Sequence, residues 1–415
     1  MSVTATTPTL DTREAMTHSD WIVLAALAST AFLGPLNSMA LNAFLPFIAE
    51  DLDTSVPVLG QITTLVFLLG ALNGLLIGPL ADRYGQRRFL MFGAAVVVGT
   101  SLGTAMAPNY EVLVGIRLFS ALSGGILGAV TLASAASLFT EDRRRKAMSL
   151  VIAGLSCAPI VGVPLLTLIG SLWHWRVAFF VLAAIALTIM GLQRFILPPD
   201  QPADQISEPL RIHSFLRAYR PLIASRHMRA MYAASFARAV TWLGILIYLG
   251  SFLRYTYNLN EREIGIGYLL LGVGYFAGSL AAGRQSMSIS LRPLYGVTSC
   301  AMAVMLTATM TLRLGVVVTL VMLAIATAIG GASYVCLTTL MVNESHAGRS
   351  TTMTLNSAVF SLGTAGGGAI GGALIAVSGY SALAIGLAGS VIVSALLVWN
   401  PLQRDSPVVP AESTS

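Results

Sequence analysis

Long runs without a charged residue constrain this chain most. Thr54 to Ala81 and Phe89 to Tyr110 contain no Asp, Glu, Lys or Arg, and the run from Ser350 to Gln403 is longer still. A helix needs about 20 apolar residues to cross the roughly 30 Å of a bilayer. Only 10% of the 415 residues are charged, whereas a soluble domain carries about 25%. The sequence therefore predicts an all-α membrane protein and excludes an ordinary soluble enzyme.

The uncharged runs divide into twelve predicted spans. We expect transmembrane helices at residues 22–45, 57–80, 89–108, 112–139, 147–169, 177–193, 230–253, 264–283, 293–312, 314–341, 351–377 and 381–400. Cytoplasmic loops of membrane proteins carry an excess of Lys and Arg. Eighteen basic residues fall in one set of alternating loops and termini, and four fall in the other set. This bias predicts that both termini face the cytoplasm of a bacterial inner membrane.

The longest polar segment divides the chain into two halves of six spans. The expected organisation is an N-terminal tail at 1–21, a first half at 22–193, a cytoplasmic linker at 194–229, a second half at 230–400 and a C-terminal tail at 401–415. Gly278 to Arg284 resembles Gly78 to Tyr84 at the same point of each half, with Ala282 opposite Asp82. Repeated halves place a substrate site near the midplane, and rocking of one half against the other exposes that site to each side in turn.

A charged stretch, G-P-L-A-D-R-Y-G-Q-R-R from Gly78 to Arg88, lies between the second and third spans. We interpret it as a short loop at the cytoplasmic surface, where Gly85 permits a turn with positive φ. Asp82 is its only carboxylate and can accept charge-assisted hydrogen bonds. An ordinary basic loop of another multi-span protein is the plain alternative.

This stretch resembles the G-x-L-A-D-R-x-G-R-R/K motif of the major facilitator superfamily. In the fifth span, Gly154, Ala158 and Gly162 recur every four residues, so that a neighbouring helix can approach closely, and Pro159 can bend the helix. The run resembles the G-x-x-x-G-P-x-x-G-G antiporter motif, from which Ala158 and Val163 depart. The chain is similar to the twelve-span drug:proton antiporters, most closely to their arabinose-efflux-permease-like branch.

The resemblance implies the fold of that superfamily, with two six-helix halves that move a small organic molecule by alternating access, and export as the direction. It also implies that a set of residues governs opening and closing: Gly78, Asp82, Arg83, Gly85, Arg87, Gly154, Pro159 and Gly162.

Two arginines fall inside predicted spans. Only 15 uncharged residues follow Arg238 before Arg254, or about 22 Å of helix, so the seventh span must extend back past Arg238. An ionisable residue within the membrane is a functional hypothesis by default, and Trp242 lies one turn away, where it can stack on the guanidinium. Arg117 resembles the arginine of a family motif that faces the central cavity. For both, a side chain that reaches back to the membrane surface is the alternative.

Acidic residues are missing from every predicted span. The resemblance implies an acid in the first span, but the matching stretch here is Asn37-Ser38, with Asn42 one turn on. Embedded carboxylates are the usual proton carriers and the usual partners of cationic substrates. Two arginines without a counter-charge instead favour an anionic substrate.

In the second half, polar and aromatic side chains recur at helical spacing and are candidate cavity walls. The full set of expected substrate-binding residues is Arg238, Arg117, Asn37, Ser38, Asn42, Trp242, Tyr268, Tyr275, Tyr334 and Asn356. For most of these aromatic residues, plain helix packing is the alternative.

The sequence thus predicts a secondary transporter, most similar to exporters, whose partners are a small-molecule substrate, the bilayer and either a coupling proton or a counter-substrate. An organic-anion importer or exchanger on the same fold is the nearest alternative, and an embedded enzyme and a channel are further ones. We expect a monomer, no nucleic-acid partner, no cofactor and no metal.

Overall fold

The computed structural model describes residues 17–139, 141–200, 219–284, 290–345 and 349–399. Within these ranges the chain is almost entirely helical. In the first half the helices are α1 (His18–Asp51), α2 (Val56–Tyr84), α3 (Gln86–Met106), α4 (Tyr110–Gly125), η1 (Ile126–Val130), α5 (Thr131–Leu138), α6 (Glu141–Cys157), η2 (Ala158–Gly162), α7 (Val163–Leu172) and α8 (Trp175–Ile196). The later helices are α10 (Arg226–Tyr257), α11 (Glu261–Arg284), α12 (Leu291–Leu312), α13 (Val316–Glu344) and α14 (Arg349–Trp399).

Eleven continuous helical stretches in the described residues are long and apolar enough to cross a membrane. The last of them, Thr351–Trp399, has 49 residues and is interrupted at Gly379, whose φ of 75° and ψ of −166° are not helical. It therefore supplies two spans, with the break at the predicted turn. The all-α fold with twelve spans is confirmed.

Two of the spans contain a π-helical segment. α4 continues through η1 into α5, and α6 continues through η2 into α7. η2 begins directly before Pro159, which has no N–H for the regular helical ladder. Such π-bulges locally rearrange backbone hydrogen bonds and occur often at functional sites.

The charged stretch after the second span corrects one prediction. We expected a loop from Gly78 to Arg88, but α2 continues to Tyr84 and α3 begins at Gln86. Only Gly85 leaves the helical conformation, with a φ of 103°. The backbone ladder persists beyond the last apolar residue because a helix that emerges from the bilayer can still hydrogen-bond internally. The side chain of Asp82 and the surroundings of Gly78 lie outside the described residues.

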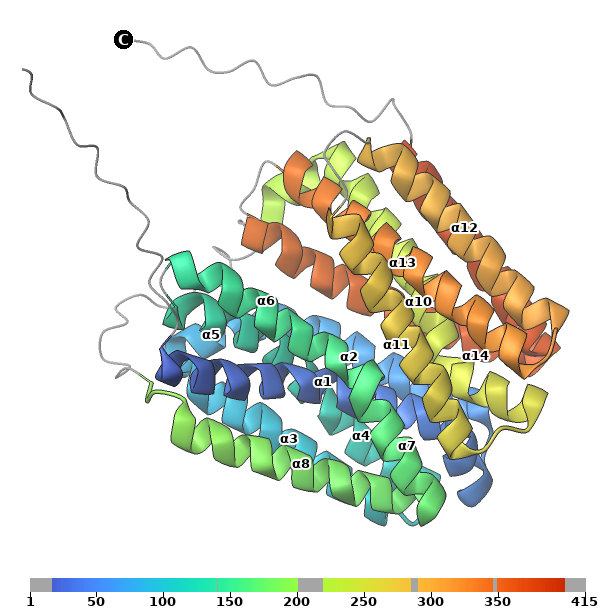
Figure 1. Cartoon of the computed structure of the whole chain (residues 1–415), viewed down its shortest axis with the longest axis horizontal. Coiled ribbons are helices and arrows are strands. Elements are labelled where there is room, and N and C mark those ends of the chain that lie inside the picture. The colour runs from blue at the N-terminus through green and yellow to red at the C-terminus, as the bar shows by residue number, and fades with distance from the viewer. Residues whose placement is uncertain (1–16, 140, 201–218, 285–289, 346–348, 400–415) are drawn as a thin grey trace, which may run out of the picture.

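The helices form two groups that lie side by side (Figure 1). In the blue-to-green group, α3 packs along α8 and α2 along α4, and in the other group α10 packs along α14 and α11 along α13. Between the groups, α2 meets α14, α7 meets α11 and α1 meets α10. The boundaries of the two halves stay a prediction, because most of the linker lies outside the described residues.

Contacts between the two groups gather near the turns Asp51–Val56 and Tyr257–Glu261, which are predicted to face outward. Tyr248 of α10 lies against Gly60 of α2. Thr167 of α7 lies against Gly265 of α11. In Figure 1 the groups meet at this end and diverge toward the other. The structure is therefore closed on the predicted outer side.

Candidate functional site

Arg238 lies in the middle of α10 with its side chain inside the protein. It is only 1% exposed, and its Nη2 donates a hydrogen bond of 2.6 Å to the backbone oxygen of Gly330 on α13. The guanidinium carbon lies 5.8 Å from the ring centre of Trp242 and 5.0 Å from that of Tyr334. Aromatic faces attract cations at this range, so the two rings hold the charge between α10 and α13.

A second layer of rings surrounds this cluster. Tyr275 of α11 lies 5.3 Å from Trp242 at an interplanar angle of 32°, and Tyr334 lies 5.9 Å from Phe360. Tyr275 and Tyr334 are partly exposed whereas Arg238 is not. The guanidinium therefore lies behind two aromatic side chains, which are the parts of the cluster that another molecule meets first.

Gly330 is necessary for this arrangement. A Cβ at this position would lie 2.8 Å from the ring of Trp242 and 2.9 Å from the sulfur of Met302, whereas real Cβ atoms essentially never approach within 3.0 Å. The absent side chain lets Trp242 lie against α13 while the Gly330 carbonyl accepts the hydrogen bond from Arg238. The sequence did not single out Gly330, since it is one of 39 glycines.

The charge of Arg238 has no acidic partner in the described part of the chain. Its Nε and Nη1 are buried without a hydrogen-bond acceptor, although the Tyr275 side chain lies close enough to interact with the guanidinium. No Asp or Glu is among the buried polar side chains of the described residues. A buried cation without a counter-charge is costly, and an incoming anion would remove that cost.

Arg117 of α4 is equally buried but better satisfied. It is 2% exposed, and it donates to the Asn37 side-chain oxygen at 3.2 Å and to the Asn37 backbone oxygen at 3.0 Å. Ser38 and Thr63 line a small space beside it. The structure thus brings Arg117, Asn37 and Ser38 together between α1, α2 and α4, and both arginine side chains are buried within the protein.

The other predicted binding residues are occupied by contacts within the protein. Asn42 accepts a 3.1 Å hydrogen bond from Thr63, and Asn356 accepts one of 2.6 Å from Ser235. The Tyr268 hydroxyl donates to the Leu246 backbone oxygen at 3.2 Å. These three side chains are buried and link helices, and they do not join the Arg238 cluster.

The predicted gating residues lie in two parts of the structure: the fifth span, and the end of α2 with the start of α3. Gly154 and Gly162 of the fifth span lie against α1, because a Cβ on Gly154 would meet the Ala28 backbone and one on Gly162 would meet Phe32. Pro159 is the second residue of the π-helical segment η2, which ends at Gly162. Arg83 lies 5.7 Å from the ring of its neighbour Tyr84 and makes no described contact with the second group of helices.

Asp200 holds the corner between α2 and α3, and sequence reasoning missed it. Its two carboxylate oxygens accept hydrogen bonds from the backbone nitrogens of Arg87, at 2.9 Å, and Arg88, at 3.1 Å. The Arg87 guanidinium donates to the backbone oxygen of Arg194. A carboxylate at a helix N-terminus satisfies unpaired N–H groups and favours the helix dipole. Nothing in the local sequence distinguishes Asp200 from other polar residues of the linker.

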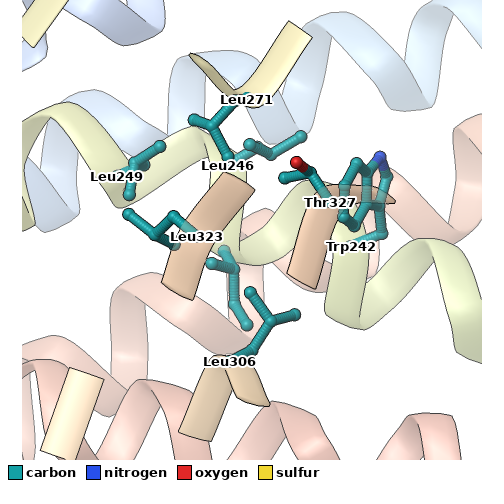
Figure 2. A pocket seen from close by; sticks show the side chains of 8 residues that line it. Trp242, Leu246, Leu249, Leu271, Leu306, Leu323 and Thr327 are labelled. Carbon is teal, nitrogen blue, oxygen red and sulfur yellow. The ribbon is translucent and has the colours of Figure 1, made fainter. Parts of the chain in front are cut away.

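An apolar pocket adjoins the Arg238 cluster. Figure 2 shows Trp242, Leu246 and Leu249 of α10 facing Leu271 of α11, Leu306 of α12, and Leu323 and Thr327 of α13. Ile245 completes the lining. The Thr327 hydroxyl donates to the Ala324 backbone oxygen at 2.9 Å, so this polar group of the wall is satisfied within its own helix. Trp242 belongs to both the pocket and the cation cluster.

A sequence model of the Major Facilitator Superfamily matches residues 27–347. The chain belongs to this superfamily. Its members are transporters and not enzymes, and this chain is a multi-span membrane transporter whose relatives include efflux pumps. It is 31% identical to the multidrug efflux pump LfrA of Mycolicibacterium smegmatis over 52% of this chain and 45% of the relative. It is 30% identical to the chloramphenicol resistance protein of Streptomyces lividans over 59% of this chain and 62% of the relative.

The superfamily fold is also found in solved structures. The nucleoside transporter NupG superposes with a TM-score of 0.74 at 13% identity, over 91% of this chain and 98% of that chain. The chain spans less than two thirds of the length of these two curated relatives. The relatives therefore show the family, and the superposition shows the fold.

Proposed function

We propose that this superfamily transporter exports a small organic molecule that carries an anionic group, by alternating access across a bacterial inner membrane with both chain termini in the cytoplasm. One observation carries the proposal: Arg238 is 1% exposed, is held by two rings and one carbonyl, and has two nitrogens without an acceptor. Similarity to the multidrug efflux pump LfrA supports export as the direction.

The difference between the two arginines supports Arg238 as the anion site. Arg117 has two oxygen acceptors from Asn37, whereas Arg238 has one, from Gly330. Hydrogen bonds to a charged group contribute about 1.5–3 kcal/mol each, so the less satisfied guanidinium gains more from an incoming anion. Tyr275 and Tyr334 are placed to admit that anion by a change of side-chain rotamer. We assign Arg117, Asn37 and Ser38 to the wall of the first half.

The experiment is a thermal-shift measurement on purified protein with three ligands of matched shape: benzenesulfonate, benzyl alcohol and benzyltrimethylammonium. We expect stabilisation by the sulfonate alone, and its loss in Arg238→Ala. Arg262→Ala is the matched control, since Arg262 is exposed and lies at the start of α11. Equal stabilisation by the neutral or cationic compound, or an unchanged sulfonate effect in Arg238→Ala, would reject the anion site.

An organic-anion importer or exchanger is the second candidate. It is favoured by the lack of acidic side chains among the buried polar residues of the described chain, because proton coupling commonly uses an embedded carboxylate. Transport in liposomes separates the two: an exchanger moves labelled benzenesulfonate only when unlabelled anion is present on the opposite side, whereas an exporter needs none.

The gate assignment is a separate proposal. Asp82, Arg83 and Arg87 would engage the second half when the predicted cytoplasmic side closes, and Gly78 and Gly85 would let the helices approach. Asp82→Asn is expected to abolish transport while the protein still reaches the membrane, as measured by uptake and by immunoblot. Normal transport by this variant would remove the proposal.

A further inference from the structure

We infer that Glu261 is a proton-binding site that controls closure on the predicted outer side, so that acidity on this side favours the closed arrangement. The inference concerns the opening of the transporter and does not rest on the proposed anion site. It is carried by the position of one carboxyl group: Glu261 is the first residue of α11, and its side chain lies against α7 of the opposite group of helices.

Gly170 of α7 leaves the room that this carboxyl group occupies. A Cβ at Gly170 would lie 3.1 Å from Oε2 of Glu261 and 2.5 Å from the ring of Phe44 on α1. The carboxyl group is thus half-buried where the two groups of helices meet. Burial of a charged carboxylate is costly, and the part of this burial that α7 provides is lost when the two groups separate on the outer side.

Arg254, the cation that acts on Glu261, is bound to other groups. It lies in the last turn of α10 and forms an ion pair of 3.5 Å with Glu50 of α1. It also donates to the Leu259 backbone oxygen at 3.4 Å, and its guanidinium carbon lies 5.1 Å from the ring centre of Phe47. No ion pair joins Arg254 to Glu261 in the described part of the chain, so the buried carboxyl group is only partly compensated.

The direction of the pH response follows from this burial. Burial raises the pKa of Glu261 to about 7 from its ordinary value of 4.5, and the charge of Arg254 lowers this pKa by a smaller amount. When the outer side opens, water reaches the carboxyl group and its pKa returns toward the ordinary value. A proton therefore binds more tightly to the closed arrangement, which gains stability as the pH falls through about 7 and has gained all of it below 4.5.

The expected size of the response is moderate. Half of the Glu261 side chain still meets water in the closed arrangement, and solvent weakens electrostatic effects of this kind. We therefore expect the ratio of closed to open molecules to rise about tenfold between pH 8 and pH 5.

The other charged groups nearest to Glu261 act differently. On α11 itself, Arg262 and Glu263 are exposed, and α7 has no charged residue between 163 and 172. On α1, protonation of Glu50 would break its ion pair with Arg254 and favour opening at low pH, which is the opposite sign.

A cluster at the start of α8 lies within one group of helices. Asp51 of α1 pairs with the Arg176 guanidinium, and His174 lies 3.9 Å from the same carboxylate. All three residues belong to the first half of the chain, so their protonation changes no contact between the two halves. Glu261 is therefore the group that links outer pH to closure.

The proton at Glu261 regulates opening and is not carried across the membrane. Glu261 lies at the predicted outer end of the fold, so its proton enters and leaves on that side. An acidic exterior would hold the transporter closed to the outside and would slow release there, whereas the energy that drives transport would be unchanged.

The test is the distance between spin labels on the two groups of helices, measured by double electron–electron resonance in lipid nanodiscs at pH 8 and pH 5. Met106→Cys and Leu314→Cys carry the labels in a variant without the native cysteines. Met106 ends α3 and Leu314 lies between α12 and α13, and both side chains are exposed at the predicted outer end. We expect the ratio of the shorter to the longer distance to rise about tenfold as the pH falls.

Glu261→Gln keeps the shape of the side chain and removes its charge, so the closed population should be as large at pH 8 as at pH 5. Glu263→Gln is the matched control on the same helix, because Glu263 is exposed and a glutamine still accepts the hydrogen bond from the Asn260 backbone nitrogen. His174→Gln is a second control, since histidine side chains change charge in the same pH range. Both controls should respond to pH as the parent does.

The outcomes decide the inference without deciding the proposed function. Distances that do not change with pH, or that lengthen as the pH falls, overturn it. A pH response that persists in Glu261→Gln, or that disappears in either control, belongs to other groups and also overturns it. Binding of benzenesulfonate at Arg238 is tested separately and is affected by none of these results.

Discussion

On the predicted outer side, the two groups of helices pack closely around the side chain of Tyr248. This side chain lies between glycines of α2 and glycines of α14. Tyr248 is fully buried, and its hydroxyl donates to the Gly368 backbone oxygen at 2.7 Å. Gly60 of α2, in the opposite group of helices, faces its ring. A Cβ on Gly60 would lie 2.5 Å from the Tyr248 Cζ and closer still to the hydroxyl. Gly60→Ala is therefore expected to penalise the closed arrangement.

The size of the penalty follows from the lack of room around the ring. Tyr248 cannot move aside, because its other faces lie against Gly371 and Gly372, where an added Cβ would be within 2.9 Å and 2.7 Å of it. Overpacking of this kind costs about 1–3 kcal/mol. The cost disappears when the halves separate on this side, so the equilibrium should shift toward the outward-open state by about 5-fold to 150-fold.

Thiol labelling measures this shift. Thr64 lies one turn from Gly60 and faces Gly368 across the same interface between α2 and α14. Thr64→Cys, introduced into a variant without the native cysteines, therefore reports opening of this interface through its reaction with a membrane-impermeant maleimide. Gly60→Ala should speed labelling from the predicted outer side. Gly74→Ala on the same helix is the control, because an added Cβ there meets nothing within 4 Å. Equal labelling rates in the two variants would refute the reasoning.

Three further substitutions test the contacts that define the site and its surroundings. Asn37→Leu removes the side-chain acceptor of Arg117 and is expected to lower stability by about 1–3 kcal/mol, measured as a lower melting temperature; an unchanged value would show that the contact is dispensable. Gly330→Ala should displace Trp242 and weaken benzenesulfonate binding, while Gly128→Ala, where an added Cβ meets nothing within 4 Å, should leave binding as it is. Asp200→Ala removes the acceptor of the Arg87 and Arg88 amides, which costs about 1 kcal/mol of local stability. Hydrogen exchange of these two amides should therefore become about fivefold faster. Unchanged exchange would contradict the role of Asp200 at the N-terminus of α3.

Features that depend on local sequence were predictable. The twelve spans follow from uncharged runs, and the break in α14 falls at Gly379, a glycine that can adopt a positive φ. The length of the run after Arg238 was enough to infer that the span extends past it, and Trp242 is one helical turn away in the structure as in the pattern. These inferences succeed because a helix fixes the spacing of side chains and the bilayer fixes its minimum length.

Features that join distant segments were not predictable from one sequence. The partner of Arg238 is a backbone carbonyl on another helix, and any residue type at position 330 supplies a carbonyl. Asn37 and Arg117 were both expected to bind substrate, but nothing in either segment indicates that they bond to each other. The end of α2 was misjudged for another reason: hydropathy marks where apolar side chains stop, whereas the helix ends only where Gly85 breaks the backbone ladder.

The direction of transport can be argued from the charge of the proposed substrate. An inside-negative membrane potential drives an anion outward with about 2.3 kcal/mol per charge for each 100 mV. Export of an anion therefore needs no coupled proton, which agrees with a described interior that holds two arginines and no acidic side chain. Liposomes loaded with benzenesulfonate should release it faster when valinomycin and a potassium gradient make their interior negative, and a pH gradient made by changing only the pH on the predicted cytoplasmic side should have little effect. Release that follows the pH gradient and ignores the potential would contradict this argument.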